Sequence, residues 1–204
     1  MATAVLVSGE GTILDAIAAA TAVDVVVADR PCRALEVARR RGVEGVLVDR
    51  AAHGGFTSRF DRAGYTAALT ELLAARRADL VCMAGFGTIL APSFFDHFEG
   101  RVLNTHPSLL PAFRGWHAVR DALAAGVATT GCTVHVATRE LDDGPILRQE
   151  SVEVRDDDDE TSLHARIKAV ERRLYPEVIA EVRAAMAAGH GPASVADRTE
   201  VAGR

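Results

Sequence analysis

The 204-residue sequence lacks paired cysteines, long apolar runs and any excess of positive charge. Its three cysteines, Cys32, Cys82 and Cys132, are far apart and odd in number, which is typical of reduced thiols in the cytoplasm rather than of a disulfide framework. Apolar runs such as Val23–Ala28 are far too short to cross a bilayer, and no secretory signal is recognisable. The net charge of −5 argues against a general nucleic-acid binder. We therefore expect a cytoplasmic protein with neither a nucleic-acid nor a membrane partner.

Short β-branched runs alternate with segments rich in Ala, Leu and Arg through the first hundred residues. Strands are predicted at 4–8, 23–28, 45–48, 80–84 and 101–104, and helices at 12–20, 33–41 and 63–76. The run at 80–84 is apolar on both faces, as in a parallel strand covered by helices. The fold class is therefore α/β, with a single open, mainly parallel twisted sheet flanked by helices.

The pattern changes after residue 100. Strands at 130–137 and 146–154 are separated by a short turn, so an antiparallel addition is expected in the C-terminal part. A long helix follows, and its apolar positions recur every three or four residues at Leu163, Ile167, Val170, Leu174, Val178 and Val182. The acidic run 156–160 suits the positive end of that helix dipole better than it suits a metal site. We expect one domain over 1–188 and a flexible tail over 189–204.

The first candidate site is the turn Ser8-Gly9-Glu10-Gly11-Thr12, between a strand and a helix. Backbone N–H groups at a helix N-terminus attract phosphate, but glycine also serves simply to turn the chain tightly. The turn lacks the full GxGxxG spacing, so a dinucleotide site is not expected. Glu10 opposes phosphate unless its side chain points away.

The second candidate is the segment around Asn104 and His106, at the carboxyl end of the fifth strand. Side chains two residues apart on a strand point the same way, and ligands of open α/β sheets bind beyond the carboxyl ends of the strands. An amide and an imidazole there can stabilise an oxyanion and move a proton, or they can cap a turn and fill a structural role. Asp142, in a turn with Gly144, either charges His106 or merely forms the turn.

No metal site is expected. His106, His117 and His135 lack a metal-binding spacing, and the cysteines form no CxxC pair.

These segments together resemble the folate-dependent formyltransferases, over about residues 4–185. The most specific part is Arg101–Pro111, which contains Asn-x-His-Pro-Ser-Leu-Leu-Pro, followed by Gly131–Pro145. The stretch Arg166–Pro176 and the early Ser-Gly-x-Gly turn indicate the branch of purine biosynthesis that formylates 5-phosphoribosylglycinamide. The resemblance implies a Rossmann-like fold, small-molecule substrates, 10-formyltetrahydrofolate as the formyl donor and no metal, and it leaves a homodimer open.

The resemblance also implies a set of site residues. The catalytic positions are Asn104, His106 and Asp142: amide and imidazolium stabilise the oxyanion, the carboxylate orients and charges the imidazole, and a bound water relays protons. The substrate-binding positions, from the phosphate turn to the ribose, are Gly9, Gly11, Thr12, Ile13, Pro107, Lys168 and Glu171. The folate-binding positions are Arg62, Thr88, Ile89, Leu90, Asn104, Val136, Ala137, Leu141 and Asp142.

Three departures from the family pattern concern the substrates rather than the catalytic positions. Ile13 stands where many relatives have an asparagine beside the phosphate. Gly87-Thr88 replaces a usual Met-Arg pair, which removes a cation that would meet the glutamate tail of the folate, and Arg62 compensates in part. The segment between the first helix and the second strand is also shorter than in most relatives.

Other functions remain open at this point. The first is formyl transfer to another amine, such as an amino sugar or a specialised metabolite. The pair Arg114-Gly115 resembles transfer-RNA and sugar formyltransferases, but a transfer-RNA enzyme usually adds a C-terminal domain and a more basic surface. A second alternative is a formyltetrahydrofolate hydrolase, a related enzyme that uses water as the acceptor. Such hydrolases usually carry an N-terminal regulatory domain, which is not expected here because the sequence opens on the first predicted strand. A binding module without turnover would not require Asn104, His106 and Asp142.

Overall fold

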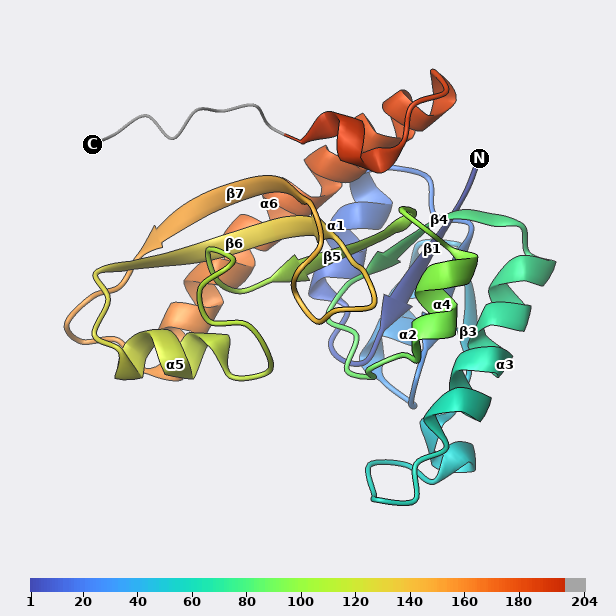
Figure 1. Cartoon of the computed structure of the whole chain (residues 1–204), viewed down its shortest axis with the longest axis horizontal. Helices are drawn as coiled ribbons and strands as arrows, with labels where there is room; N and C mark the ends of the chain where they lie inside the picture. Colours follow the sequence, from blue (N-terminus) through green and yellow to red (C-terminus); the bar gives the residue numbers. More distant parts are fainter. Residues whose placement is uncertain (197–204) are drawn as a thin grey trace.

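The computed structural model describes residues 1–196. Helices and strands alternate through most of this length (Figure 1). The elements are β1 (Ala2–Val7), α1 (Thr12–Ala20), β2 (Val25–Ala28), α2 (Arg33–Arg40), β3 (Glu44–Leu47), η1 (Arg50–His53), α3 (Arg62–Ala75), β4 (Ala78–Met83), α4 (Pro92–His97), β5 (Val102–His106), α5 (Ala118–Ala124), β6 (Thr129–Val136), β7 (Ile146–Glu153), α6 (Glu160–Ala187) and η2 (Pro192–Val195).

A seven-stranded sheet with the order β3-β2-β1-β4-β5-β6-β7 organises the molecule. The strands from β3 to β5 are parallel, and β6 and β7 are added antiparallel to β5. The predicted mainly parallel sheet with an antiparallel C-terminal addition is therefore confirmed. The chain winds outward from β1 in both directions, so a crevice is expected where β1 and β4 separate at their carboxyl ends.

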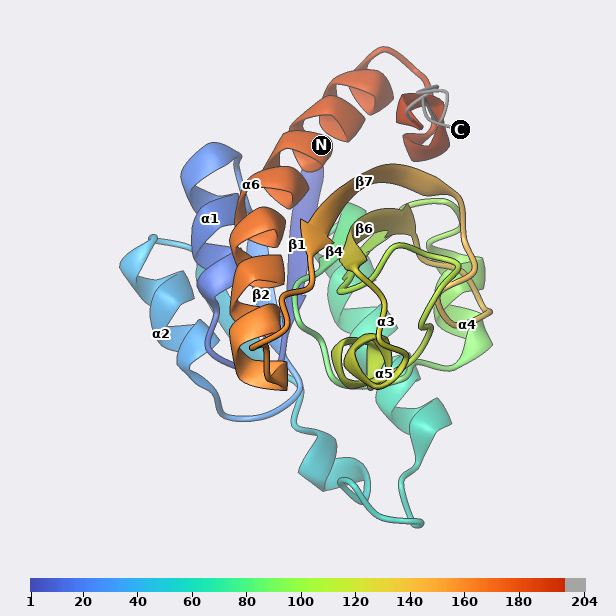
Figure 2. The same ribbon diagram turned by 90° about the vertical axis from the view of Figure 1, so that its left-hand side faces the viewer.

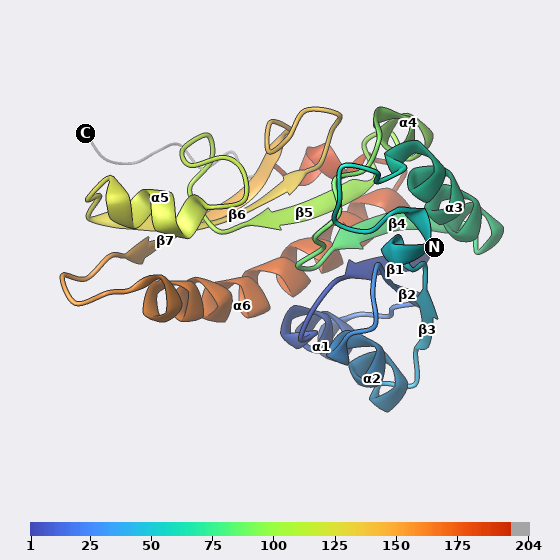
Figure 3. The ribbon, with the colours of Figure 1, turned by 90° about the horizontal axis from the view of Figure 1, so that it is seen from below.

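Helices cover both faces of the sheet, with α1, α2 and α6 on one face and α3 and α4 on the other (Figures 2 and 3). Alternate side chains of β1 divide between the two cores. Val5 and Val7 pack with α1 and α6, whereas Ala4 and Leu6 pack with α3 and α4. The central strands β1, β2 and β4 are thus buried on both sides, as in a parallel sheet covered by helices, whereas the edge strand β3 is mostly exposed.

The predicted long helix is confirmed as α6, which begins at the acidic run. Asp159 caps it by accepting a hydrogen bond from the Ser162 amide at 2.7 Å, and Asp158 pairs with Arg166. Hydrogen bonds from Arg166 and from the Arg155 amide lower the pKa of Asp158. The acidic run therefore serves the helix N-terminus, as the dipole argument predicts.

Four short helical segments were not predicted, namely η1, α4, α5 and η2. They have 4, 6, 7 and 4 residues, which is too short for a helical period to emerge from the sequence. The C-terminal segment η2 packs against α6, and its Pro192 is buried. Residues 197–204 of the predicted flexible tail lie outside the described residues, so that tail stays a prediction. Within residues 1–196, no helix is long and apolar enough to cross a membrane.

Candidate active site at the carboxyl ends of the strands

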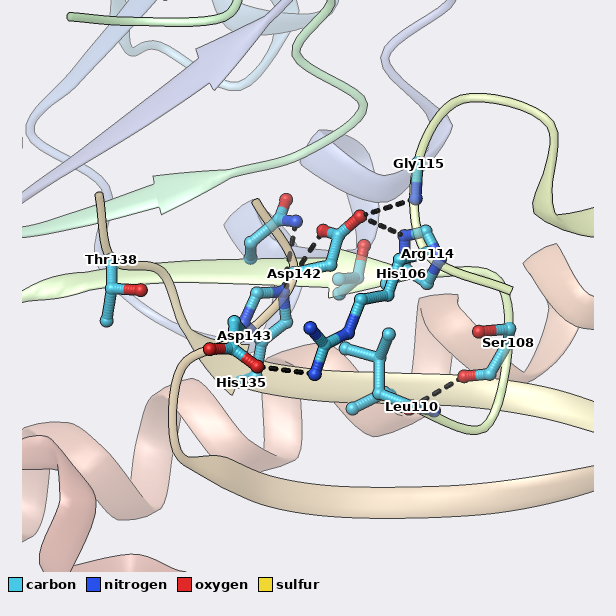
Figure 4. Close-up of polar contacts among 12 residues, drawn as sticks. His106, Ser108, Leu110, Arg114, Gly115, His135, Thr138, Asp142 and Asp143 are labelled. Atoms are coloured by element: carbon cyan, nitrogen blue, oxygen red, sulfur yellow. Dashed lines mark hydrogen bonds and ion pairs between the residues drawn. The ribbon is translucent and has the colours of Figure 1, made fainter. Parts of the chain in front are cut away.

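Asn104, His106 and Asp142 come together at the end of β5. Figure 4 shows His106 and His135 on either side of Asp142. Nδ1 of His106 lies 3.3 Å from Oδ2 of Asp142, and both side chains are buried, with 5% and 7% of their surface exposed. The Gly115 amide donates a further hydrogen bond of 2.9 Å to the same carboxylate oxygen. A buried carboxylate with these two partners holds the imidazole in one orientation, which is the geometry that a general acid requires.

Both ring nitrogens of His106 face hydrogen-bond acceptors. Nε2 donates to the Phe113 carbonyl at 2.8 Å, while Nδ1 faces the Asp142 carboxylate. A carbonyl and a carboxylate can only accept, so each ring nitrogen must carry a proton in order to bond to the acceptor that it faces. A ligand oxygen accepts the Nε2 proton only if it takes the place of the Phe113 carbonyl.

The turn that carries Asp142 is held against the end of β6. Asp142 has a φ of 53°, and the Val136 amide donates to the Pro145 carbonyl at 2.9 Å. A Cβ on Gly144 would stand 1.7 Å from the Val136 carbonyl oxygen. Only glycine permits this approach, so Gly144 fixes the distance between the turn and the strand.

His135 is a member of the site that the sequence reasoning dismissed, since it was considered only as a metal ligand. It lies opposite Asn104 in the β5–β6 pairing, and its Nε2 accepts a hydrogen bond of 3.2 Å from the Asn104 amide. Nδ1 donates to the Val136 carbonyl at 3.2 Å. Burial lowers the pKa of His135, which keeps the ring neutral and able to accept at Nε2. This ring therefore holds one N–H of the Asn104 amide and leaves the other free.

A pocket of about 390 Å³, here called the reaction pocket, opens over these residues. Its volume is in the range of small-molecule sites. Most of the predicted site residues line it, namely Ile13, Arg62, Thr88, Ile89, Leu90, Asn104, His106, Pro107, Ala137, Leu141, Asp142, Lys168 and Glu171. The unpredicted residues in its lining include Trp116, His135 and His164. The predicted residues outside the lining are Gly9, Gly11, Thr12 and Val136.

The Gly9–Thr12 turn has a structural reason for its glycine. Gly11 has a φ of 75°, and a Cβ there would lie 2.8 Å from the Ala34 backbone on α2. The adjacent Glu10 forms an ion pair with Arg33 at 3.0 Å, so the positive charge of Arg33 partly offsets the negative charge that Glu10 brings to the turn. Close packing of α1 on α2 thus accounts for the glycine, and phosphate binding at this turn stays a prediction.

Glu171 and Lys168 reach the reaction pocket from α6. Glu171 is buried and accepts a hydrogen bond from the Thr105 hydroxyl, next to both strand residues of the site. Burial raises the pKa of Glu171, while that hydrogen bond opposes the shift. His164 lies on α6 one turn before Lys168, and its burial and the charge of Lys168 lower its pKa. The predicted ribose contacts of Lys168 and Glu171 stay predictions.

Thr88 is buried, and its predicted contact with the folate stays a prediction. Only 4% of its surface is exposed, and its hydroxyl donates to Asp29 at 2.7 Å. Nη1 of Arg50 donates to the same hydroxyl oxygen at 3.0 Å. Arg62 donates to the Leu90 carbonyl from the neighbouring wall of the pocket. Thr88 therefore links a buried carboxylate to a guanidinium that sequence reasoning did not identify.

Within residues 1–196, no group of three His, Cys, Asp or Glu side chains is suited to hold a metal ion. The site contains donors and acceptors of protons, with a neutral imidazole, an imidazole–carboxylate pair and an amide beside a pocket. Such a set can stabilise the oxyanion of an acyl-transfer intermediate and move its protons.

The sequence profile of the formyl transferase family matches residues 1–179. The chain therefore belongs to the formyl transferase family. The resemblance seen in the sequence is thereby confirmed.

Within that family, the chain is similar to phosphoribosylglycinamide formyltransferases. The enzyme of Mycobacterium tuberculosis (strain H37Rv) is 45% identical over 206 aligned positions, which cover 98% of this chain and 90% of that protein. The human trifunctional purine biosynthetic protein adenosine-3 is 34% identical over 184 positions, covering 86% of this chain and 18% of that longer protein. The solved glycinamide ribonucleotide transformylase 1 from Symbiobacterium toebii has a TM-score of 0.81 and 43% identity, over 87% of this chain and 84% of that one.

Proposed function

We propose that this chain transfers the formyl group of 10-formyltetrahydrofolate to the primary amine of 5-phosphoribosylglycinamide, a step of purine biosynthesis. The observation that carries the proposal is the buried His106–Asp142 pair beside the Asn104 amide, in the lining of one pocket. The names and the high coverage of the relatives support the same reaction and the same two substrates.

The reaction forms one C–N bond and breaks another. The acceptor amine attacks the formyl carbon, and the carbonyl electrons move onto its oxygen. Collapse of this intermediate expels N10 of the folate, which takes a proton, while the attacking nitrogen loses one. The chain contributes two hydrogen-bond donors for the oxyanion, the free N–H of Asn104 and the Nε2–H of His106.

Asp142 and His135 act through these donors. The carboxylate of Asp142 faces Nδ1 of His106 and fixes its ring, so that Nε2 is directed at the oxyanion. His135 orients the Asn104 amide, so that the second N–H of the amide points at the developing charge. For His106 to donate, the formyl oxygen must displace the Phe113 carbonyl from Nε2.

The apolar wall of the reaction pocket suits the flat pterin ring of the donor. Ile89 and Leu90 face the segment 137–142 across this wall, and Lys168 and Glu171 approach from α6 on the side proposed for the acceptor. We place the reaction in the cytoplasm, because Cys32, Cys82 and Cys132 are all free thiols.

An acceptor screen tests the proposal. The purified chain is supplied with 10-formyltetrahydrofolate and one amine at a time, and release of tetrahydrofolate is followed. We expect turnover with 5-phosphoribosylglycinamide and at least a hundredfold lower kcat/KM with glycinamide riboside, which lacks the phosphate. Faster turnover with an amino sugar or another amine would replace the proposed acceptor, since Ile13 brings no polar group to the phosphate side.

A further inference from the structure

The segment 113–116, which leads from the turn after β5 to α5, lies beside the reaction pocket and contributes Gly115 and Trp116 to its lining. Within residues 1–196, three polar contacts connect this segment to the rest of the chain. The Phe113 carbonyl accepts from Nε2 of His106, the Gly115 amide donates to Asp142, and Arg114 forms an ion pair with Asp143 (Figure 4). The Trp116 side chain is 62% exposed and adds little packing. The position of the segment therefore depends mainly on these three contacts.

The chain on either side of this segment is fixed more firmly. Before it, the Leu110 amide donates to the Thr133 hydroxyl at 3.0 Å, and the Leu110 carbonyl accepts from Gln149 at 2.8 Å. After it, Ala118 and Val119 are buried at the start of α5. A movement of the segment can thus take place between two fixed points, without displacing the sheet or α5.

The backbone on both sides of the ion pair is strained. Phe113 has a φ of 54° and Asp142 a φ of 53°, and each precedes one partner of the ion pair in the chain. Residues with a large side chain avoid this left-handed region, because the Cβ comes too close to the following carbonyl oxygen. Such strain persists only where surrounding contacts hold it, and it is common in segments that switch between two arrangements.

The contact that this strained segment makes with His106 competes with the proposed reaction. Nε2 of His106 donates to the Phe113 carbonyl at 2.8 Å, so the proton required by the oxyanion is already engaged. The Arg114–Asp143 ion pair lies next to this contact, and its side chains are 44% and 48% exposed. An exposed ion pair contributes little free energy, so it can open and close readily.

We propose that the Arg114–Asp143 ion pair is a latch, which holds the Phe113 carbonyl on Nε2 of His106 in the resting protein. Opening of the latch releases the segment 113–116 and frees the Nε2 proton for the formyl oxygen. This second part rests on the proposed function, whereas the first part concerns the resting protein alone. A ligand that needs the open form has its apparent affinity lowered by the fraction of molecules that are open.

The latch is tested with Arg114→Gln, Asp143→Asn and the double variant. Each should increase the rate at which diethyl pyrocarbonate modifies His106 by about two- to fivefold, the range of an exposed ion pair. Mass spectrometry of the peptide that contains His106 measures this rate, with the exposed His190 as the internal reference. The double variant should exceed neither single variant, because all three lack the same contact.

Two further measurements follow the same variants. Time-resolved fluorescence anisotropy of Trp116, the only tryptophan, should show faster motion of the segment. With both substrates present, kcat/KM for the formyl donor should rise about two- to fivefold. Because the single variants remove charges of opposite sign, a mere change of electrostatic field at His106 would shift their rates in opposite directions.

Asp96→Asn is the matched control, because it breaks the ion pair with Arg139, which joins the same β6–β7 turn to α4. It should leave the modification of His106 and the anisotropy of Trp116 unchanged. Ionic strength provides a test without mutation, since salt screens exposed ion pairs. Added potassium chloride should speed the modification of His106 in the unaltered protein and not in the double variant.

An unchanged or slower modification of His106 in the two single variants would overturn the latch, and so would shifts in opposite directions. A fall of kcat/KM in both variants would mean that the segment positions Asp142 for the reaction, and would overturn it as well. If the variants modify faster while the unaltered protein transfers no formyl group, the latch is supported and the proposed function fails.

Discussion

The reaction pocket and a second pocket, lined by Arg30, Arg50, Arg62, Phe56 and Phe60 among others, share part of their walls, but their polar side chains are held in different ways. In the reaction pocket, His106 and Asp142 are buried and are held by their mutual ion pair and by hydrogen bonds to the backbone. In the second pocket, Arg50 stacks on the rings of Phe56 and Phe60 and donates hydrogen bonds to the Gly55 carbonyl and the Thr88 hydroxyl, and the Phe56 ring is largely exposed. A satisfied buried polar network is rigid, whereas a cation stacked on an exposed ring mainly adds charge at the surface. The first arrangement suits bond making, and the second presents positive charge to solvent.

The strongest test of this contrast removes a member of the buried pair. His106→Ala and Asp142→Asn should each lower kcat by about 10² to 10⁴, the range of a general acid–base group, and change the donor KM little. Steady-state kinetics measure the effect, and circular dichroism checks that the fold is retained. Loss of donor binding without loss of kcat would mean that the pair serves binding rather than the chemical step.

Gly144→Ala should show how far catalysis depends on the rigid turn. The added Cβ would stand 1.7 Å from the Val136 carbonyl oxygen, so the turn must shift and carry Asp142 with it. We expect the free energy of unfolding to fall by about 1–3 kcal/mol and kcat to fall as well. Gly191→Ala is the control, because a Cβ there meets no atom within 4 Å. Unchanged stability and kcat in Gly144→Ala would show that the turn is pliable.

His135 should matter less than the pair, because it acts through Asn104. We expect His135→Phe to lower kcat about fivefold, the effect of one lost hydrogen bond of about 1 kcal/mol. His135→Gln has a side-chain oxygen that can accept from the Asn104 amide, and it should recover part of the rate. A structural role alone predicts instead that both variants lose stability equally and that glutamine gives no recovery of kcat.

The smallest expected effect is the response of stability to pH. Burial lowers the pKa of His135, so the folded chain keeps this ring neutral while the unfolded chain protonates it below about pH 6.5. The unfolded state then binds more protons, and the free energy of unfolding falls on acidification by up to about 1.4 kcal/mol per pH unit. Urea titrations at pH 7.5, 6.5 and 5.5 measure this slope. The slope should be shallower in His135→Gln, and equal slopes would contradict the assignment.

Local periodicity predicted much of the fold. Helix α1 has the predicted bounds, because a Gly-containing turn precedes a run of good helix formers. The strands were found within a few residues, since buried parallel strands are apolar on both faces. Residue spacing also predicted that Asn104 and His106 project in the same direction.

The residues alone left the partnership of Asp142 with His106 as one of two alternatives, since 36 residues separate them in the chain, and only the family resemblance favoured it. The role of His135 was missed because it depends on the register between β5 and β6, which pairs it with Asn104. Register follows from the connecting loop and from packing, neither of which has a local signal. Phe56 likewise gave no signal, because a single aromatic residue in a loop predicts no stacking partner.

The sequence by itself determined the order of the longer helices and strands and the motif at Asn104 and His106, because each is encoded by neighbouring residues. The lack of a cation at position 88 was visible only against the pattern of the family. Tertiary structure alone decided that Arg50 reaches Thr88 and that Phe56 and Phe60 enclose it. These contacts join the segment after β3 to the loop after β4, two strands that are not neighbours in the sheet. Side-chain stacking between such segments depends on distances that exist only after the sheet has formed, so no local pattern in the sequence could show it.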